Sequence, residues 1–280
     1  MPELPEVETI ARGLAQRVNG DVIESVWLGS KPEPLKSPAA EIAATLEARR
    51  IANVRRVGKH IVFDLNGKLK SKNKSRKIRT VSPEAQWIVH LGMTGRMLVC
   101  QPAAAIDKHT HAIVRLGSGR ELRFVDPRRF GRLSVSQQFA AAGSEPLEVD
   151  FERFATLFRG RKTPIKSALL NQKLLSGVGN IYADESLFRA GIRPRRRAAS
   201  LTRDDLRRLY ANLQEVLKEA IKLGGSSVSD YVGADGEEGF FQLRHRVYGR
   251  EGEPCLVCKT PIKRVVIAGR SSHYCPKCQK

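Results

Sequence analysis

Cys255-Leu256-Val257-Cys258 and Cys275-Pro276-Lys277-Cys278 are two C-x-x-C pairs that decide the fold at the C-terminal end of the chain. Each pair can place two sulfurs on one side of a tight turn, and a hairpin between the pairs would bring four thiolates into a tetrahedron around Zn²⁺. A closed four-sulfur site leaves no open coordination position, so we expect one structural zinc ion rather than a catalytic one. A redox-active pair is the alternative, and His273 is either a competing ligand or an ordinary hairpin histidine.

The segment between the two cysteine pairs has the pattern of a β-hairpin. Val265-Val266-Ile267 has the β-branched composition of a strand, and Ala268-Gly269 supplies a turn before Arg270. Arg270 would project from this hairpin, where its charge is compatible with a solvated side chain or with a phosphate contact. The tail has little apolar core of its own, so the metal is expected to supply much of its folding free energy. The fifth cysteine, Cys100, is expected to be a small buried side chain.

Upstream of the hairpin, the hydrophobic pattern changes from strand-like to helical along the chain. Helices are predicted over residues 151–158, 164–175, 180–190 and 203–223. The predicted order is a β-rich N-terminal domain over residues 1–136, a linker over 137–150, a helical domain over 151–244 and the zinc hairpin over 245–280. We therefore expect a multidomain protein of mixed α and β structure.

The chain is strongly basic, with 49 Lys and Arg residues against 29 Asp and Glu residues and a formal net charge of +20. Such an excess favours a polyanionic partner, with nucleic acid ahead of an anionic membrane surface. No apolar run approaches the roughly 20 residues that a membrane-spanning helix needs. The acidic, proline-containing N-terminus does not resemble a secretory signal, so we expect a cytoplasmic protein.

Residues 67–82 form a basic insert in the strand-like region, with seven Lys and Arg residues and no acidic one. The composition predicts a flexible loop. Two interpretations remain open for it, a solvated insert and an arm that contacts DNA without sequence preference.

The N-terminus combines a predicted helix with unusual chemistry. The helix should run from Pro5 to about Gly20 and bury one apolar face. Removal of Met1 would expose the secondary amine of Pro2, and an α-amine has a pKa near 7.7–8.0 against about 10.4 for lysine. A larger fraction would therefore be neutral and able to attack a carbon electrophile, with Glu3 beside it as a proton donor. On these residues alone, a helix with acidic residues in its first turn remains the simpler interpretation.

The order of short motifs along the chain resembles that of bacterial formamidopyrimidine-DNA glycosylases almost from end to end. Each string is weak alone, but their joint order is highly specific. The matching strings are Met1-Pro-Glu-Leu-Pro-Glu-Val-Glu-Thr9, Gly58-Lys-His60, His90-Leu-Gly-Met-Thr-Gly-Arg96, Lys108-His109, Asp126-Pro-Arg-Arg-Phe-Gly131, Lys162-Thr-Pro-Ile-Lys166, Gly177-Val-Gly-Asn-Ile-Tyr-Ala183, and the tail from Val247-Tyr-Gly-Arg250 through the cysteines to Gln279.

The resemblance implies a fold and a set of catalytic roles. The fold would be an N-terminal β-sandwich flanked by helices, followed by a helix–two-turn–helix domain and a zinc hairpin with four cysteine ligands. Pro2 would be the Schiff-base nucleophile and Glu3 the general acid. Lys59 would be a proton donor associated with β-elimination, and Arg270 would be associated with δ-elimination and with holding a phosphate. The activity implied is a bifunctional glycosylase and lyase that acts on oxidised purines.

The same resemblance implies contacts with damaged double-stranded DNA. His109, Arg128 and Lys162 match DNA-contact positions, and Asn180 matches a phosphate ligand at the start of a helix. Met93, Arg128 and Phe130 would fill the space that a flipped nucleotide leaves, because an apolar chain and a ring can stack there while a guanidinium meets the orphaned base. Without the resemblance, Met93 and Phe130 would be assigned to the core.

Two other functions compete with this interpretation. The first alternative is an endonuclease VIII-type enzyme for oxidised pyrimidines, whose N-terminal sequence resembles Pro-Glu-Gly-Pro-Glu. This chain instead has Leu4 between Glu3 and Pro5. A non-enzymatic zinc-ribbon protein that binds DNA would have no use for the free proline or for Glu3. We expect a monomer that acts on DNA without a membrane partner.

Overall fold

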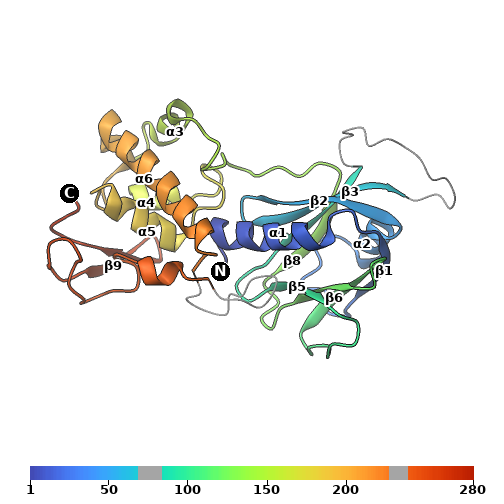
Figure 1. Cartoon of the computed structure of the whole chain (residues 1–280). Helices are drawn as coiled ribbons and strands as arrows, with labels where there is room; N and C mark the ends of the chain where they lie inside the picture. The colour runs from blue at the N-terminus through green and yellow to red at the C-terminus, as the bar shows by residue number, and fades with distance from the viewer. Residues whose placement is uncertain (69–83, 227–238) are drawn as a thin grey trace. The chain divides into compact units, whose positions relative to one another are not determined.

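The computed structural model describes residues 1–68, 84–226 and 239–280 (Figure 1). These residues form two compact units, which are considered separately below. The first unit contains residues 1–2, 6–140 and 239, and the second contains residues 3–5, 141–226 and 240–280. Most of the basic insert, residues 69–82, lies outside the described residues, whereas Gly67 and Lys68 continue a strand rather than begin a loop.

Helix α1 (Leu4–Val18) begins one residue earlier than predicted, with Pro5 in its first turn, where the missing amide hydrogen costs nothing. Its predicted apolar face is confirmed, because the side chains at this helical spacing are buried in the core of the first unit. They are Val7, Ile10, Ala11 and Leu14. The turn after the helix contains Gly20 at φ +86°, a left-handed conformation that glycine adopts without strain.

Two antiparallel four-stranded sheets make up most of the rest of the first unit, in the blue-to-green part of Figure 1. The first sheet has the order β1 (Ile23–Leu28), β6 (Thr110–Leu116), β7 (Glu121–Val125) and β5 (Arg96–Cys100). The second has the order β2 (Arg49–Val57), β3 (His60–Lys68), β4 (Ala85–His90) and β8 (Arg132–Ser136). Trp87 of one sheet and Phe124 of the other belong to the same apolar core, so the expected β-sandwich is confirmed.

Helix α2 (Ala39–Leu46) lies in a region that the sequence pattern assigns to strands. It has eight residues and buries only Ile42 and Leu46, which are one turn apart. A helix this short contains too little of the repeating pattern to be recognised in a longer window. Pro38 at its N-cap is the local signal for its start.

The second unit is helical, with α3 (Phe151–Phe158), α4 (Ile165–Leu169), α5 (Asn180–Arg189) and α6 (Arg203–Lys222). A short 3₁₀ helix, η1 (Ala198–Ser200), lies between α5 and α6, and a second, η2 (Phe241–Arg244), comes after α6 in the chain. Asp150 caps α3, and Thr202 forms a reciprocal capping box with Asp205 at the start of α6. The helices bury one continuous apolar core that includes Tyr182 and Phe158.

Helix α4 ends at Leu169, although the sequence pattern extends it to Leu175. Polar side chains stop it by bonding to the backbone. The Gln172 amide donates to the carbonyl groups of Leu170 and Val178 at 2.9 and 2.8 Å, and its oxygen accepts from the Gly177 amide at 2.9 Å. The chain after α4 is therefore a series of turns that leads into α5.

The tail forms the predicted hairpin from β9 (Lys263–Ile267) and β10 (Arg270–Tyr274), which pair antiparallel. Cys255 and Cys275 belong to a small apolar cluster with Phe188 and Val247. Among the described residues, no helix has the length and apolar character needed to cross a membrane.

Candidate functional site

Glu3 lies at the N-terminus of helix α5, within the second unit. The Ile181 amide donates to Oε1 of Glu3 at 3.2 Å, and the Leu4 amide donates to the carbonyl oxygen of Gly177 at 3.0 Å. The N-cap residue of α5 is Gly179, which has no side chain to bond the first turn, so the Glu3 carboxyl group takes this place. Glu3 is only 5% exposed. A buried carboxyl group is thus fixed directly after Pro2 in the chain.

Gly179 makes room for this carboxyl group. A Cβ atom built on Gly179 would lie 2.1 Å from Cδ of Glu3 and 2.4 Å from its Oε1. Such distances do not occur between real atoms, so any side chain at position 179 would displace the acid. The second glycine of the Gly-x-Gly sequence before α5 is therefore required by the close approach of Glu3, whereas the first, Gly177, has φ +103° and packs against Leu4, 2.9 Å from where its Cβ would lie.

Asn180, the first residue of α5, joins a polar group on the zinc hairpin. Its Nδ2 donates to Oγ of Ser271 at 3.3 Å, and burial raises the pKa of Tyr248 while the nearby Asn180 side chain acts to lower it. Arg270 precedes Ser271 and is exposed at the start of β10. Tyr248 had no predicted role, although it lies in one of the matching sequence strings. The helix N-terminus, Asn180, Tyr248 and Arg270 together offer several donors to an anion.

A buried ion pair holds the hairpin beside α5. Nζ of Lys166 lies 2.6 Å from Oδ1 of Asp184 and donates to the carbonyl oxygen of Ser271 at 2.6 Å, and both side chains are almost fully buried. Burial lowers the pKa of Lys166, while the neighbouring carboxylate of Asp184 opposes this shift. The other oxygen of Asp184 accepts from the His273 amide at 2.9 Å. Sequence reasoning assigned no role to this pair, which fixes the strand that begins with Arg270.

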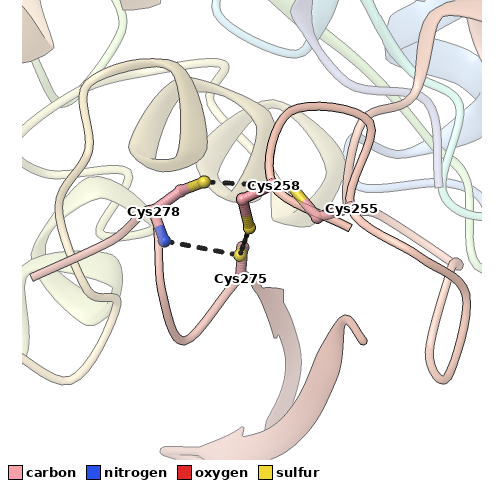
Figure 2. Close-up of side chains that lie close together, drawn as sticks. All are labelled: Cys255, Cys258, Cys275 and Cys278. Atoms are coloured by element: carbon pink, nitrogen blue, oxygen red, sulfur yellow. Dashed lines mark hydrogen bonds between the residues drawn. The ribbon is translucent and has the colours of Figure 1, made fainter. Parts of the chain in front are cut away.

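The four cysteines of the two pairs converge as predicted (Figure 2). Their sulfurs all lie within 4.8 Å of one another, with 3.4 Å between Cys258 and Cys275 and 3.9 Å between Cys255 and Cys278. A tetrahedron with Zn–S bonds of about 2.3 Å requires sulfurs about 3.8 Å apart, so the four thiols fit one zinc ion. The Gln279 amide side chain bonds both the Cys275 amide and the Ile192 carbonyl group, which attaches the cluster to the helical part of the unit.

The positions of His273 and Cys100 decide the two remaining expectations about possible metal ligands and cysteines. His273 is not part of the cysteine cluster, and its ring nitrogen Nδ1 lies 3.4 Å from Asp184. It is therefore the ordinary hairpin histidine of the two alternatives. The expectation for Cys100 is wrong, because this residue ends the strand β5 and is only half-buried.

In the first unit, three predicted DNA-contact side chains are exposed on two neighbouring turns. Met93 is 41% exposed and Phe130 is 51% exposed, although both are large and apolar. The guanidinium carbon of Arg128 lies 4.7 Å from the centre of the Phe130 ring, a cation–π contact. Assignment of Met93 and Phe130 to the core is thus excluded. Single exposed apolar side chains are common, but a group of them on adjoining turns is typical of an interaction surface.

The two turns touch each other through their glycines. A Cβ atom on Gly92 would lie 2.5 Å from the amide nitrogen of Gly131, and Gly92 has φ +64°. A Cβ atom on Gly131 would lie 2.5 Å from the Phe124 ring. The glycines of the two sequence strings are therefore explained by backbone packing between the turns.

The remaining predicted residues occupy separate places. Pro2 is buried and lies in the first unit, two residues before the start of α1, while Met1 is exposed. Lys59 lies in the tight turn between β2 and β3 and is 7% exposed. His109 precedes β6 and is partly exposed, and Lys162 is exposed just before α4. The structure thus groups Glu3, Asn180 and Arg270 in one unit, and Met93, Arg128 and Phe130 in the other.

Comparison with known proteins gives consistent matches along the chain. Residues 1–133 match the formamidopyrimidine-DNA glycosylase N-terminal domain, residues 142–232 match the H2TH domain of that enzyme, and residues 252–280 match the zinc finger found in FPG and IleRS. The formamidopyrimidine-DNA glycosylase of Solibacter usitatus is 45% identical, with all of both chains covered, and that of Thermus thermophilus is 44% identical, with 100% and 98% covered.

Solved structures match over the same length. The MutM (Fpg) protein of Thermus thermophilus gives a TM-score of 0.84 at 42% identity, with 99% of this chain and 98% of that chain covered. A Lactococcus lactis Fpg mutant in complex with Fapy-dG-containing DNA gives a TM-score of 0.86 at 30% identity, with both chains fully covered.

Proposed function

Because this chain belongs to the formamidopyrimidine-DNA glycosylase family, we propose that it excises oxidised purines from double-stranded DNA and then cleaves the strand at the abasic site. The substrates would be 8-oxoguanine and formamidopyrimidines. One observation carries the proposal most directly. The Glu3 carboxyl group is buried against Gly179 at the start of α5, so an acid is held one residue from the Pro2 amine.

In the proposed reaction, the amine of Pro2 attacks C1′ of the damaged nucleotide once Met1 has been removed. The bond between C1′ and the base breaks, and its electron pair leaves with the base, which takes up a proton. The ring bond between C1′ and O4′ then opens as a C1′=N iminium ion forms, and Glu3 supplies the proton for O4′. The iminium carries its charge without needing a further proton.

Strand cleavage follows from the acidity of the iminium intermediate. The positive charge weakens the C2′–H bond, so loss of that proton expels the 3′ phosphate by β-elimination. A second elimination releases the 5′ phosphate, and water hydrolyses the iminium to free the amine. We assign Lys59 to proton transfer in the first elimination and Arg270 to the second, where its charge would also hold a phosphate. The burial of Lys59 in a tight turn and the exposure of Arg270 on a fixed strand support these roles.

The DNA backbone would bind to donors of both units. Asn180, Tyr248 and the N-terminus of α5 would hold one phosphate next to Arg270, and His109 and Lys162 would contact others. Met93, Arg128 and Phe130 would occupy the gap left by the extruded nucleotide, and their exposure on two turns supports this. The structural zinc ion would be held by Cys255, Cys258, Cys275 and Cys278.

The proposal also covers the domain boundaries, the oligomeric state and the cellular location of the protein. Residues 1–136 would form the catalytic domain, 137–150 the linker, 151–244 the helical DNA-binding domain and 245–280 the zinc hairpin, and the three family matches support this order. We propose that the protein acts as a monomer in the bacterial cytosol, on nucleoid DNA.

Release of bases from defined duplexes tests the substrate class. One duplex carries 8-oxoguanine opposite cytosine and the other carries thymine glycol opposite adenine. We expect release from the first to be faster by at least about tenfold, a difference that a site built to hydrogen-bond its substrate supplies easily. Faster release of thymine glycol would instead support the endonuclease VIII-type alternative. Binding of both duplexes without release of either base would support the non-enzymatic protein.

A further inference from the structure

Asp126 is fully buried at the junction of the two turns that carry Met93, Arg128 and Phe130. Its Oδ1 accepts from the Thr94 hydroxyl group at 2.5 Å and from the Arg128 amide at 3.2 Å. Its Oδ2 accepts from the Gly131 amide at 2.7 Å. One carboxylate therefore bonds to both turns, and each of its oxygens is used.

The backbone of Asp126 extends this arrangement to the segment before β6. Its amide donates to the carbonyl oxygen of His109 at 3.0 Å, and its carbonyl oxygen lies 2.9 Å from Nε2 of His111 and accepts from the Arg129 amide at 3.3 Å. Four predicted DNA-contact residues of the first unit are thus linked to Asp126. His109 and Arg128 are hydrogen-bonded to it directly, and Met93 and Phe130 are the sequence neighbours of Thr94 and Gly131, which are hydrogen-bonded to it.

We propose that Asp126 is the positioning residue that holds Met93, Arg128 and Phe130 as one rigid wedge, and thereby sets the efficiency of nucleotide extrusion from a duplex and the discrimination of the opposite base. This inference rests on the proposed function. Asp126 is not itself a catalytic residue, because its carboxylate is fully buried beneath the turns and has no exposed surface to offer to DNA.

A rigid support is needed because ordering flexible turns and side chains on binding costs conformational entropy. That cost would reduce the free energy gained when these side chains insert into the DNA. The contact of Gly92 with Gly131 leaves the two turns no room to shift separately, and the Asp126 bonds fix them in that contact. The three side chains can then enter the gap together. The conformational entropy of fixing them is lost when the protein folds, and not when the nucleotide is extruded.

The chemistry of the site requires a carboxylate rather than an amide. The Arg128 and Gly131 amides both donate, and they approach different oxygens of Asp126. The variant Asp126→Asn would direct its own NH2 group at one of these donors, so one bond would be replaced by a repulsive contact. The change conserves volume and leaves the apolar core intact.

The test compares borohydride trapping of an abasic site in a duplex with trapping of the same site in the isolated strand, which has no partner base and no gap to fill. For Asp126→Asn, the ratio of the duplex rate to the single-strand rate should fall by at least about tenfold, the effect of losing one hydrogen bond to a charged group. The preference for cytosine over adenine opposite 8-oxoguanine should also weaken. Partial unfolding lowers all rates together and does not change either ratio.

A second pair of variants keeps the test valid if Asp126→Asn does not fold. Thr94→Val removes one donor with little change in volume, whereas Thr94→Ser retains the hydroxyl group. We expect Thr94→Val to reduce both ratios and Thr94→Ser to restore them. Ratios equal to those of the wild type in both Asp126→Asn and Thr94→Val would overturn the inference. Failure of the wild type to be trapped by either DNA would overturn the proposed function itself, and the inference with it.

Discussion

The carboxyl group of Glu3 occupies the space in which a side chain of Gly179 would otherwise lie. The two residues are far apart in the sequence, yet the acid bonds to the first turn of the helix that Gly179 caps. Gly179 has φ −130°, a conformation open to every residue type. Its lack of a side chain is thus required by space alone.

The variant Gly179→Ala should therefore displace Glu3 without straining the backbone. We expect release of 8-oxoguanine to fall by about a hundredfold or more, the usual contribution of a general acid. Trapping of a preformed abasic site should fall as well, because Glu3 also supplies the proton for O4′ when the iminium ion forms at that site. The control is Gly117→Ala, whose new Cβ would meet its neighbours no closer than 3.6 Å. Equal base release by Gly179→Ala and the wild type would show that the position of Glu3 is unimportant.

The sequence predicts those parts of the fold that repeat or carry special residue types. Helix α3, the buried face of α1 and the four converging cysteines follow from spacing and composition. Helix α2 and the early end of α4 do not, because the first is too short for periodicity and the second depends on bonds from the Gln172 side chain.

The candidate site shows the same limit. Motif resemblance identifies residues such as Asn180 and Phe130, whereas the residues that support them become visible only when the fold brings distant segments together. Lys166 and Asp184 are ordinary helix residues in the sequence, and Asp126 is one acid in a matching string.

The buried pair of Lys166 and Asp184 makes a prediction about stability. Replacement of the lysine in Lys166→Met leaves the Asp184 carboxylate buried without its cation, which should lower the free energy of unfolding by about 3–5 kcal/mol. Arg203→Ala removes the partner of Glu152 in an exposed pair and should cost about 1 kcal/mol or less. Urea denaturation followed by circular dichroism measures both values. Equal costs for the two variants would contradict the proposed anchoring of the hairpin.

Zinc content provides a prediction with an internal control. The wild type should bind one zinc ion per chain, and Cys275→Ala should lose it together with most of its affinity for DNA, because β10 begins at Arg270 and ends next to Cys275. Cys100→Ala should keep the ion, since this cysteine lies in the first unit. Atomic emission of the purified proteins gives the stoichiometry. Retention of one zinc by Cys275→Ala would exclude the four-cysteine site.

The buried side chain of His90 should make the free energy of unfolding depend on pH. Burial, followed by the charges of His60, Lys59 and Arg132, lowers the pKa of His90 to about 4, and its Nδ1 accepts from the Gly92 amide at 3.1 Å. In the unfolded chain the histidine binds a proton near pH 6.5. Between these values the unfolded state holds more protons, so the free energy of unfolding should fall as the pH falls, by about 3 kcal/mol at most.

The variant His90→Asn keeps an acceptor near the position of Nδ1 but does not titrate, so its loss of stability between pH 6.5 and 4 should be smaller. Tryptophan fluorescence follows this unfolding selectively, because Trp27 and Trp87 are the two tryptophans and both lie in the first unit. The same pH dependence in the variant and the wild type would show that His90 is not the responsible group.

The identity of the nucleophile is tested most directly by mapping the covalent bond to DNA. The intermediate with DNA containing 8-oxoguanine opposite cytosine is reduced with borohydride, digested with nuclease and trypsin, and analysed by mass spectrometry. Trypsin first cleaves after Arg12, so residues 2–12 form one peptide. We predict that the sugar remnant is attached to the amine of Pro2 in this peptide, without Met1. A remnant on Lys59 or another lysine, or an N-terminal peptide that retains Met1 in the trapped protein, would contradict the mechanism.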